Sequence, residues 1–138
     1  MIQKGPHKFS GGEIEVLAND ILHVKYHAGR KLTVDDVTAV RDKRIELIGK
    51  TAYYPIVDMT SGTLKFTDEA KAWVAVNNEG ISFRLLDVFL VKSLVMKFKV
   101  KLYLTLFKPV NETIVVTSLD EALEVIKDHK HQAQKHTA

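Results

Sequence analysis

Residues 54–60 read Tyr-Pro-Ile-Val-Asp-Met-Thr, and they are followed by Ser-Gly-Thr-Leu-Lys-Phe at 61–66 and Thr-Asp-Glu-Ala-Lys-Ala-Trp-Val at 67–74. The apolar run begins beside a proline and ends before a Ser-Gly pair, which is typical of a buried strand followed by a turn. Thr67 then precedes two acids and an apolar stripe, a pattern that predicts a helix from about Thr67 to Asn77. Strand, turn and helix in this order form half of a βαβ unit, so the stretch predicts an α/β fold.

The segments on either side of this stretch extend the same pattern. Two runs of alternating apolar and polar residues, 13–17 and 21–26, surround Ala18-Asn19-Asp20 and predict a β-hairpin. A helix is predicted from Thr33, which precedes two acidic residues, to Gly49. Buried strands are predicted at 85–91 and 113–117. The expected centre of the sheet is Ile56, Val57, Leu86, Val88, Leu90 and Val115.

A Ser-Leu-Asp-Glu capping box at 118–121 opens a last predicted helix. The residues after Lys127 lose the apolar stripe of this helix, and those before Gly12 are mostly polar. We therefore expect one domain with an ordered core of about 13–130, a loose N-terminus and a basic C-terminal tail.

The composition excludes several classes of protein. A chain of 138 residues with 46% hydrophobic and 27% charged residues matches a globular domain and not a disordered chain. The lack of cysteine excludes a disulfide framework and thiolate metal sites. No window approaches the roughly 18 apolar residues of a membrane span, and the N-terminus lacks the apolar core of a signal peptide, so we expect a cytoplasmic location without a membrane span. A net charge of +3 is too small to indicate nucleic acid.

The segment 93–107 has two periodicities. From 96 to 102, lysines alternate with apolar residues, which is the period of a strand and is the pattern that periodicity alone favours. Helical spacing of three and four residues is also present, among Val95, Phe98, Leu102 and Leu106. In a helix, we expect these four apolar side chains to be buried against the sheet. Lys97 and Lys101, one turn apart, would then remain in solvent.

The order of the elements resembles that of a known family. A hairpin, a helix opened by Leu-Thr-Val-Asp-Asp-Val at 32–37, the strand at 54–60, a helix entered through Phe-Thr-Asp-Glu-Ala at 66–70 and a terminal helix in Thr-Ser-Leu-Asp-Glu-Ala-Leu at 117–123 are similar to bacterial STAS-like, or anti-sigma-factor-antagonist-like, domains. This group includes small stand-alone STAS/CRAL-TRIO-like proteins. The resemblance implies a single STAS-like domain, with a mixed sheet and about four helices mainly on one side. It also implies a helix at 93–107, which we adopt over the strand.

Signalling members of the STAS-like family carry a phosphorylated serine at the start of the helix that follows the central strand. The matching positions here are Thr67-Asp68-Glu69-Ala70, so acids replace the serines, and Thr67 and Ser61 are the remaining candidate acceptors. An N-cap threonine and a turn serine also explain these two hydroxyls without phosphorylation. The interaction surface that the resemblance implies consists of Asp58, Thr60, Ser61, Thr67, Asp68 and Glu69.

Catalytic and metal-binding patterns are missing from the sequence. It contains no glycine-rich phosphate loop, nucleophile elbow or paired catalytic acids, so we expect no enzyme activity and no cofactor. His129 and His131 are two residues apart on a predicted helix and therefore point to different faces, so no metal site is expected there. Asp58 stands at the end of a strand, where α/β folds place functional acids but where an aspartate also caps the following turn.

Two functions from different classes fit these patterns. The resemblance favours a non-enzymatic regulatory or protein-interaction module, with a protein partner or a homodimer. The alternative is a protein that binds a small apolar, lipid-like ligand, because residues 83–107 are rich in aromatic side chains and CRAL-TRIO-like domains hold lipids. Core packing or a homodimer interface would account for the same side chains. The basic patch Lys97, Lys101 and Lys108 would suit an anionic partner or a solvated surface.

Overall fold

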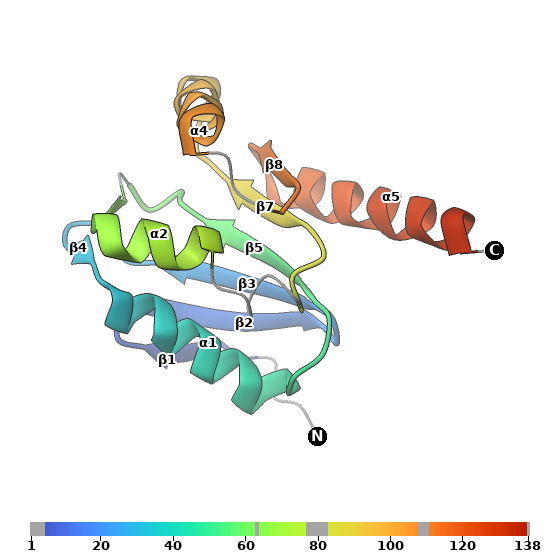
Figure 1. Ribbon diagram of the computed structural model, residues 1–138, viewed down its shortest axis with the longest axis horizontal. Coiled ribbons are helices and arrows are strands. Elements are labelled where there is room, and N and C mark those ends of the chain that lie inside the picture. The colour runs from blue at the N-terminus through green and yellow to red at the C-terminus, as the bar shows by residue number, and fades with distance from the viewer. Residues whose placement is uncertain (1–4, 63, 77–82, 108–110, 138) are drawn as a thin grey trace.

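The computed structural model describes residues 5–62, 64–76, 83–107 and 111–137, which build a mixed sheet between helices (Figure 1). The six-stranded sheet has the order β1-β2-β3-β5-β7-β8. Its strands are β1 (His7–Phe9), β2 (Gly12–Ala18), β3 (Ile21–Tyr26), β5 (Tyr54–Asp58), β7 (Asp87–Leu90) and β8 (Thr113–Val116). The first three are antiparallel, and β3, β5, β7 and β8 run parallel. A separate parallel pair joins β4 (Lys31–Leu32) to β6 (Lys65–Phe66).

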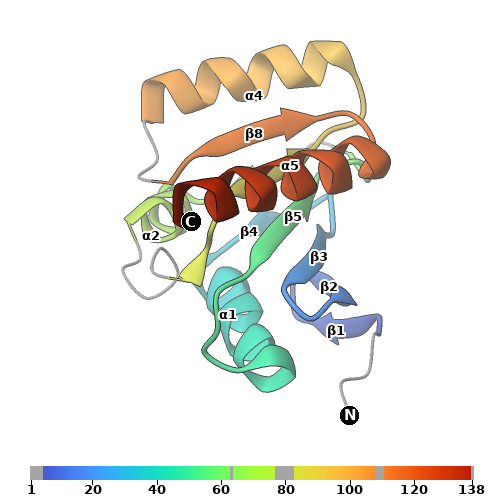
Figure 2. The same ribbon diagram turned by 90° about the vertical axis from the view of Figure 1, so that its right-hand side faces the viewer.

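The described helices are α1 (Val34–Ile48), α2 (Asp68–Val76), α4 (Leu94–Phe107) and α5 (Leu119–Thr137). Helices α1 and α2 cover one face of the sheet, where their apolar side chains pack with those of β2 and β3. Helix α5 covers the opposite face, and α4 lies beside the edge strand β8, on the side of α1 and α2 (Figures 1 and 2). This arrangement confirms the predicted α/β fold with a mixed sheet, an N-terminal hairpin and helices mainly on one side.

Most local predictions are also confirmed. The hairpin β2–β3, the helix that begins after Thr33 and the strand β5 lie where the sequence places them. Thr67 caps α2, because its hydroxyl oxygen accepts a hydrogen bond from the backbone N–H of Ala70 at 3.0 Å. At the start of α5, the Ser118 hydroxyl oxygen likewise accepts a hydrogen bond from the backbone N–H of Glu121 at 3.1 Å. The expected centre of the sheet is buried except for Val57.

Both ends of the chain are more ordered than expected. Residues 7–9 form β1, which pairs with β2 in place of a loose start. Helix α5 continues to Thr137, where the sequence predicted fraying after Lys127. Two contacts that a helical stripe does not reveal hold this extension to the sheet: the Tyr54 hydroxyl lies 2.8 Å from His129 Nδ1, and Lys130 Nζ lies 2.9 Å from Asp20 Oδ2.

Residues 94–107 form the helix that the family resemblance implies, so the strand that periodicity alone favoured is wrong. The expected burial of its apolar stripe is also wrong. The side chains of this stripe point into solvent, with exposed fractions of 66% for Val95, 70% for Phe98, 54% for Leu102 and 77% for Leu106. The reason is that α4 lies beside the sheet edge and turns the opposite side, with Met96 and Val100, toward the protein.

Candidate functional site

The two faces of the sheet are covered to different degrees at the central strands β5 and β7. Ile56 and Val88 face α5, and both are 0% exposed. Val57 and Phe89 lie on the other face and are only partly buried, although both strands have neighbours on each side. Apolar side chains in the middle of a parallel sheet are normally buried on both faces. The partial exposure therefore marks a place where no helix packs directly on the sheet.

A cavity of about 590 Å³ occupies this place. Its floor is formed by alternate residues of β3, β5, β7 and β8, because alternate side chains of a strand face the same side. Its walls come from α1, α2 and α4. Its apolar lining includes Leu22, Val24, Val57, Trp73, Phe89, Met96, Val100 and Leu104. The volume falls within the range of roughly 300–1,000 Å³ that is usual for small-molecule sites.

Three arginines, Arg41, Arg44 and Arg84, line the part of the cavity formed by α1 and by the segment before β7. Arg44 is only 2% exposed, and its guanidinium carbon lies 5.1 Å from the ring centroid of Tyr53 and 5.4 Å from that of Phe83. Distances of this size allow cation–π attraction, which is stronger in a desolvated site. The cation thus forms part of an aromatic wall.

Arg84 is held by the protein itself. Its Nη2 donates a hydrogen bond to the carbonyl oxygen of Val74 at 3.0 Å, and its Nε lies 3.4 Å from Asp87 Oδ1. Burial raises the pKa of the Asp87 carboxyl, and the charge of Arg84 and a hydrogen bond from Asn111 only partly offset this rise. The guanidinium of Arg84 therefore already has partners within the protein.

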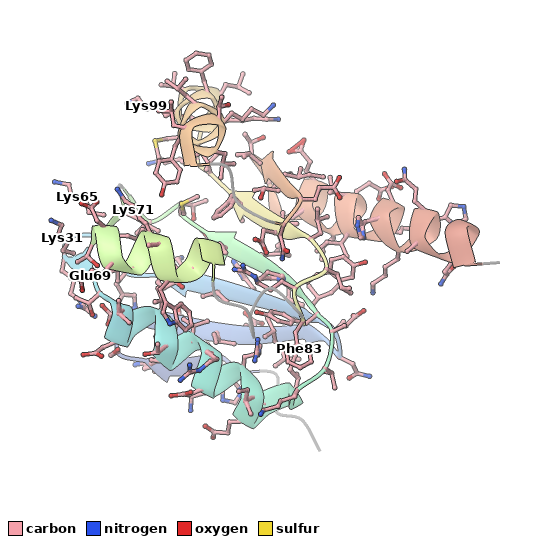
Figure 3. The ribbon with its side chains drawn as sticks, in the orientation of Figure 1. Lys31, Lys65, Glu69, Lys71, Phe83 and Lys99 are labelled. Carbon is pink, nitrogen blue, oxygen red and sulfur yellow. The ribbon has the colours of Figure 1, made fainter. Side chains whose placement is uncertain are left out.

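Four lysines surround the other part of the cavity. Lys31 and Lys65 are paired across β4 and β6, Lys71 stands on α2, and Lys99 stands on α4. Figure 3 shows Lys31, Lys65 and Lys71 gathered at one end of the molecule, away from Phe83. The ammonium of Lys71 lies 5.5 Å from the Tyr103 ring centroid and 3.9 Å from Asp68 Oδ1. No ion pair with an acid is formed by Lys31, Lys65 or Lys99 within the described part of the chain. This end of the cavity is therefore basic.

The described residues contain no group of three side chains suited to hold a metal ion. They also contain no helix that is both long and apolar enough to cross a membrane. The apolar floor of the cavity and the lysines at one end have the chemistry of a site for an organic ligand.

A model of a family described as a domain of unknown function, DUF7793, matches residues 15–130, which is most of the chain. The chain belongs to the DUF7793 family. No curated protein and no solved structure matches it. The matched residues of this DUF7793 domain include all those that line the cavity, from Leu22 to Thr113.

The residues of the predicted interaction surface have different environments. Asp58 is 4% exposed, and its Oδ1 accepts hydrogen bonds from the backbone N–H and the hydroxyl of Thr60 at 2.8 and 2.6 Å. The exposed Ser61 donates its hydroxyl to the carbonyl oxygen of Tyr26 at 3.0 Å. Thr67 is the N-cap described above, while Asp68 and Glu69 are exposed at the start of α2. Asp58 and Thr60 thus stabilise a turn, and an interaction role for the six residues of this surface stays a prediction.

Asp58 has a second partner that sequence reasoning missed. Its Oδ2 lies 2.7 Å from His23 Nε2, since β3 and β5 are adjacent parallel strands. Burial acts to raise the pKa of Asp58, but the hydrogen bonds from Thr60 and His23 outweigh it and lower the pKa below its ordinary value. Residues 35 positions apart give no local signal of this contact. Only the pairing of β3 with β5 could have revealed it.

Two residues of the predicted basic patch, Lys97 and Lys101, lie one turn apart on α4, on the border that faces β8. Lys108 lies outside the described residues. The predicted site residues did not include the cations that line the cavity, which are Lys31, Arg41, Arg44, Lys65, Lys71, Arg84 and Lys99. The sequence did contain a signal that Arg44 faces inward. Arg44 follows Val37 by seven residues and therefore lies on the same, apolar face of the helix.

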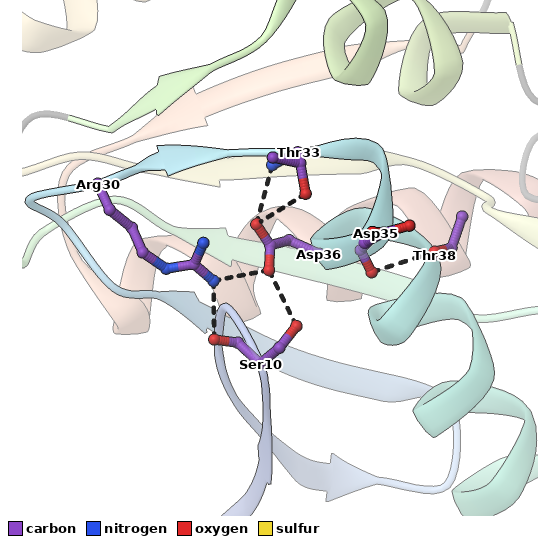
Figure 4. A network of polar contacts seen from close by, with 6 residues as sticks. All are labelled: Ser10, Arg30, Thr33, Asp35, Asp36 and Thr38. Atoms are coloured by element: carbon purple, nitrogen blue, oxygen red, sulfur yellow. Dashed lines mark hydrogen bonds and ion pairs between the residues drawn. The ribbon is translucent and has the colours of Figure 1, made fainter.

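A polar network beside the lysine end joins β4 to α1 (Figure 4). Asp36 is 3% exposed and sits at its centre. Its Oδ1 accepts hydrogen bonds from Arg30 Nη2 at 2.6 Å and from the Ser10 hydroxyl at 2.9 Å, and its Oδ2 accepts one from the Thr33 N–H at 2.8 Å. Burial acts to raise the pKa of Asp36, but these hydrogen bonds prevail and lower it to about 2.

We expect Asp36→Asn to lower the free energy of unfolding by about 2 kcal/mol at neutral pH. The folded chain lowers the pKa of this carboxyl, so its contribution is present above the ordinary pKa and disappears as the pH falls from about 4 toward about 2. Urea unfolding of both proteins across this range measures the effect. The exposed neighbour Asp35 gives the control, since Asp35→Asn should show little change at any pH. A loss at Asp36 that does not vary with pH would contradict the expectation.

Proposed function

We propose that this DUF7793 domain is a non-enzymatic binding protein for a small amphipathic anion, with an apolar body and a carboxylate or similar head group. The observation that carries the proposal is the cavity of about 590 Å³ over β5 and β7, which leaves Val57 and Phe89 partly exposed in the middle of the sheet. The aromatic residues in the chain and the CRAL-TRIO-like resemblance support the same class of ligand. The proposal develops the alternative function that the sequence suggested, the binding of a lipid-like ligand. It adds that the ligand carries a negative charge.

The charges of the lining support an anion and suggest how it is oriented. The acidic lining residues are Asp68 and Asp87, and each lies near a basic partner, Lys71 and Arg84. Lys31, Lys65 and Lys99 are exposed at the other end. A head group placed among these lysines stays in contact with water, which avoids the large cost of burying a charge. The apolar body would then lie along Val57 and Phe89.

Titration calorimetry with dodecanoate, below its micelle concentration, tests the site. Val100 faces the cavity, so Val100→Trp should fill part of it and weaken dodecanoate binding by about tenfold or more. The matched control is Val95→Trp on the same helix, because Val95 is 66% exposed and faces away from the cavity. Binding by the control should equal that of the wild type. Equal losses in both variants, or no binding by the wild-type protein, would refute the proposed site.

A second comparison tests the head group. Dodecyltrimethylammonium has the same alkyl chain as dodecanoate but a positive charge, and we expect it to bind several-fold more weakly. The double substitution Lys65→Gln and Lys99→Gln should reduce the difference in affinity between the anion and the cation. The same change at Lys8 and Lys127, two exposed residues outside the cavity, should leave that difference unchanged. If the cation binds as well as the anion, the apolar cavity remains but the lysines do not recognise the ligand.

A further inference from the structure

The outward side of α4 is an apolar surface that no described element covers. It consists of Leu94, Val95, Phe98, Leu102 and Leu106, which we call the outer face. Each of these side chains is more than half exposed, and Leu94 and Leu106 reach 76% and 77%. At about 3.6 residues per turn they fall on one continuous side of the helix. Contiguous exposed apolar surface of this kind marks a site of association in most soluble proteins.

Lysines border the outer face on both sides. Lys97 and Lys101 follow one border, next to β8, and Lys99 lies on the other border, next to the cavity. The chain has no acidic residue between Asp87 and Glu112, while the same interval contains Lys92 and Lys108 in addition. An apolar side bordered by lysines is a feature that α4 shares with helices that lie in the interface of a membrane, although the opposite side of α4 is also apolar, since it lines the cavity. With 14 residues, α4 is too short to span the bilayer.

A second copy of the chain would complement this surface poorly. Packing two outer faces against each other would bring Lys97, Lys99 and Lys101 near the same lysines of the other copy, and α4 offers no carboxylate to pair with them. An anionic lipid surface supplies both an apolar layer and negative charge. The geometry points to the outer face of α4 as a docking site for an anionic membrane surface, with the helix parallel to that surface. This inference concerns the side of α4 opposite the cavity and does not depend on the cavity's ligand.

Cosedimentation with vesicles tests the docking site. We expect the full chain to bind vesicles of phosphatidylcholine with a minor fraction of phosphatidylglycerol, to bind pure phosphatidylcholine far more weakly, and to dissociate as salt is added. The double variant Phe98→Asp and Leu102→Asp should lose at least about tenfold in affinity. It should fold normally, since both residues are exposed, and circular dichroism verifies this. The control is Leu123→Asp, because Leu123 is an exposed leucine on α5, away from the outer face.

A second pair of variants tests the charge. Lys97→Glu with Lys101→Glu should weaken binding by at least about tenfold, whereas the equal charge change at Lys8 and Lys127 should have a much smaller effect. The cavity variant Val100→Trp should bind vesicles like the wild type, which separates docking from uptake of lipid into the cavity. Loss of vesicle binding in Val100→Trp would overturn the inference. A dimer in sedimentation equilibrium that the Phe98 and Leu102 variant converts to monomers would also overturn it, since the outer face would then be a contact between copies.

Discussion

Replacing Val88 by alanine is expected to lower the free energy of unfolding by about 2 to 3 kcal/mol, whereas the same substitution at Val57 should lower it by about 1 kcal/mol or less. Val88 is 0% exposed and packs between the sheet and α5. Val57 stands on the adjacent strand β5, but it faces the cavity and is already partly exposed. Removing its methyl groups enlarges an existing space, so fewer contacts are lost.

Urea unfolding of the two variants under identical conditions measures this difference. Because both substitutions remove the same atoms from neighbouring strands, the comparison does not depend on the transfer free energy of the side chain. The two sites differ in that Val57 faces the cavity, whereas Val88 faces the packed core under α5. Similar losses in Val57→Ala and Val88→Ala would mean that both faces of the sheet are packed equally, and the proposed ligand site would then be excluded.

The sequence predicted those features of the fold that depend on local pattern. The hairpin, the cap at Thr67 and the capping box at Ser118 each lie within a few neighbouring residues, and the structure has all of them. The buried strand at 54–58 was recognisable because residues of a central parallel strand form a continuous apolar run. Local chemistry alone was sufficient for these elements.

Features that depend on how elements are placed relative to one another could not be predicted. The spacing of Phe98 and Leu102 shows that one side of α4 is apolar, but it does not show whether that side meets the sheet or solvent. The chain order also does not reveal that β3 lies beside β5, the pairing that brings His23 to Asp58. The cavity has the same origin, because it results from the distance of α4 from the sheet and not from any residue pattern.

Arg44 illustrates how a buried charge is hidden in a sequence. Long basic side chains are mostly exposed, so an arginine within a helix is normally assigned to the solvent side. In the sequence, Arg41 stands one turn before Arg44 and interrupts the apolar stripe of α1, which consists of Val37, Val40, Ile45 and Ile48. The side chain of Arg41 is 32% exposed and pairs with Asp42 at 3.1 Å, while Arg44 is buried between aromatic rings.

Arg44→Ala is expected to lower the free energy of unfolding by about 3 kcal/mol, because it removes a large, fully buried side chain and its contacts with Tyr53 and Phe83. Arg44→Met retains most of the volume without the charge, and we expect it to lose less than half as much, since an apolar side chain in a buried site escapes the cost of desolvating a guanidinium. Arg41→Ala provides the control on the same helix and should cost less than about 1 kcal/mol. Urea unfolding of the three variants measures these values. If methionine proves as destabilising as alanine, the charge of Arg44 and not its volume holds α1 against the sheet.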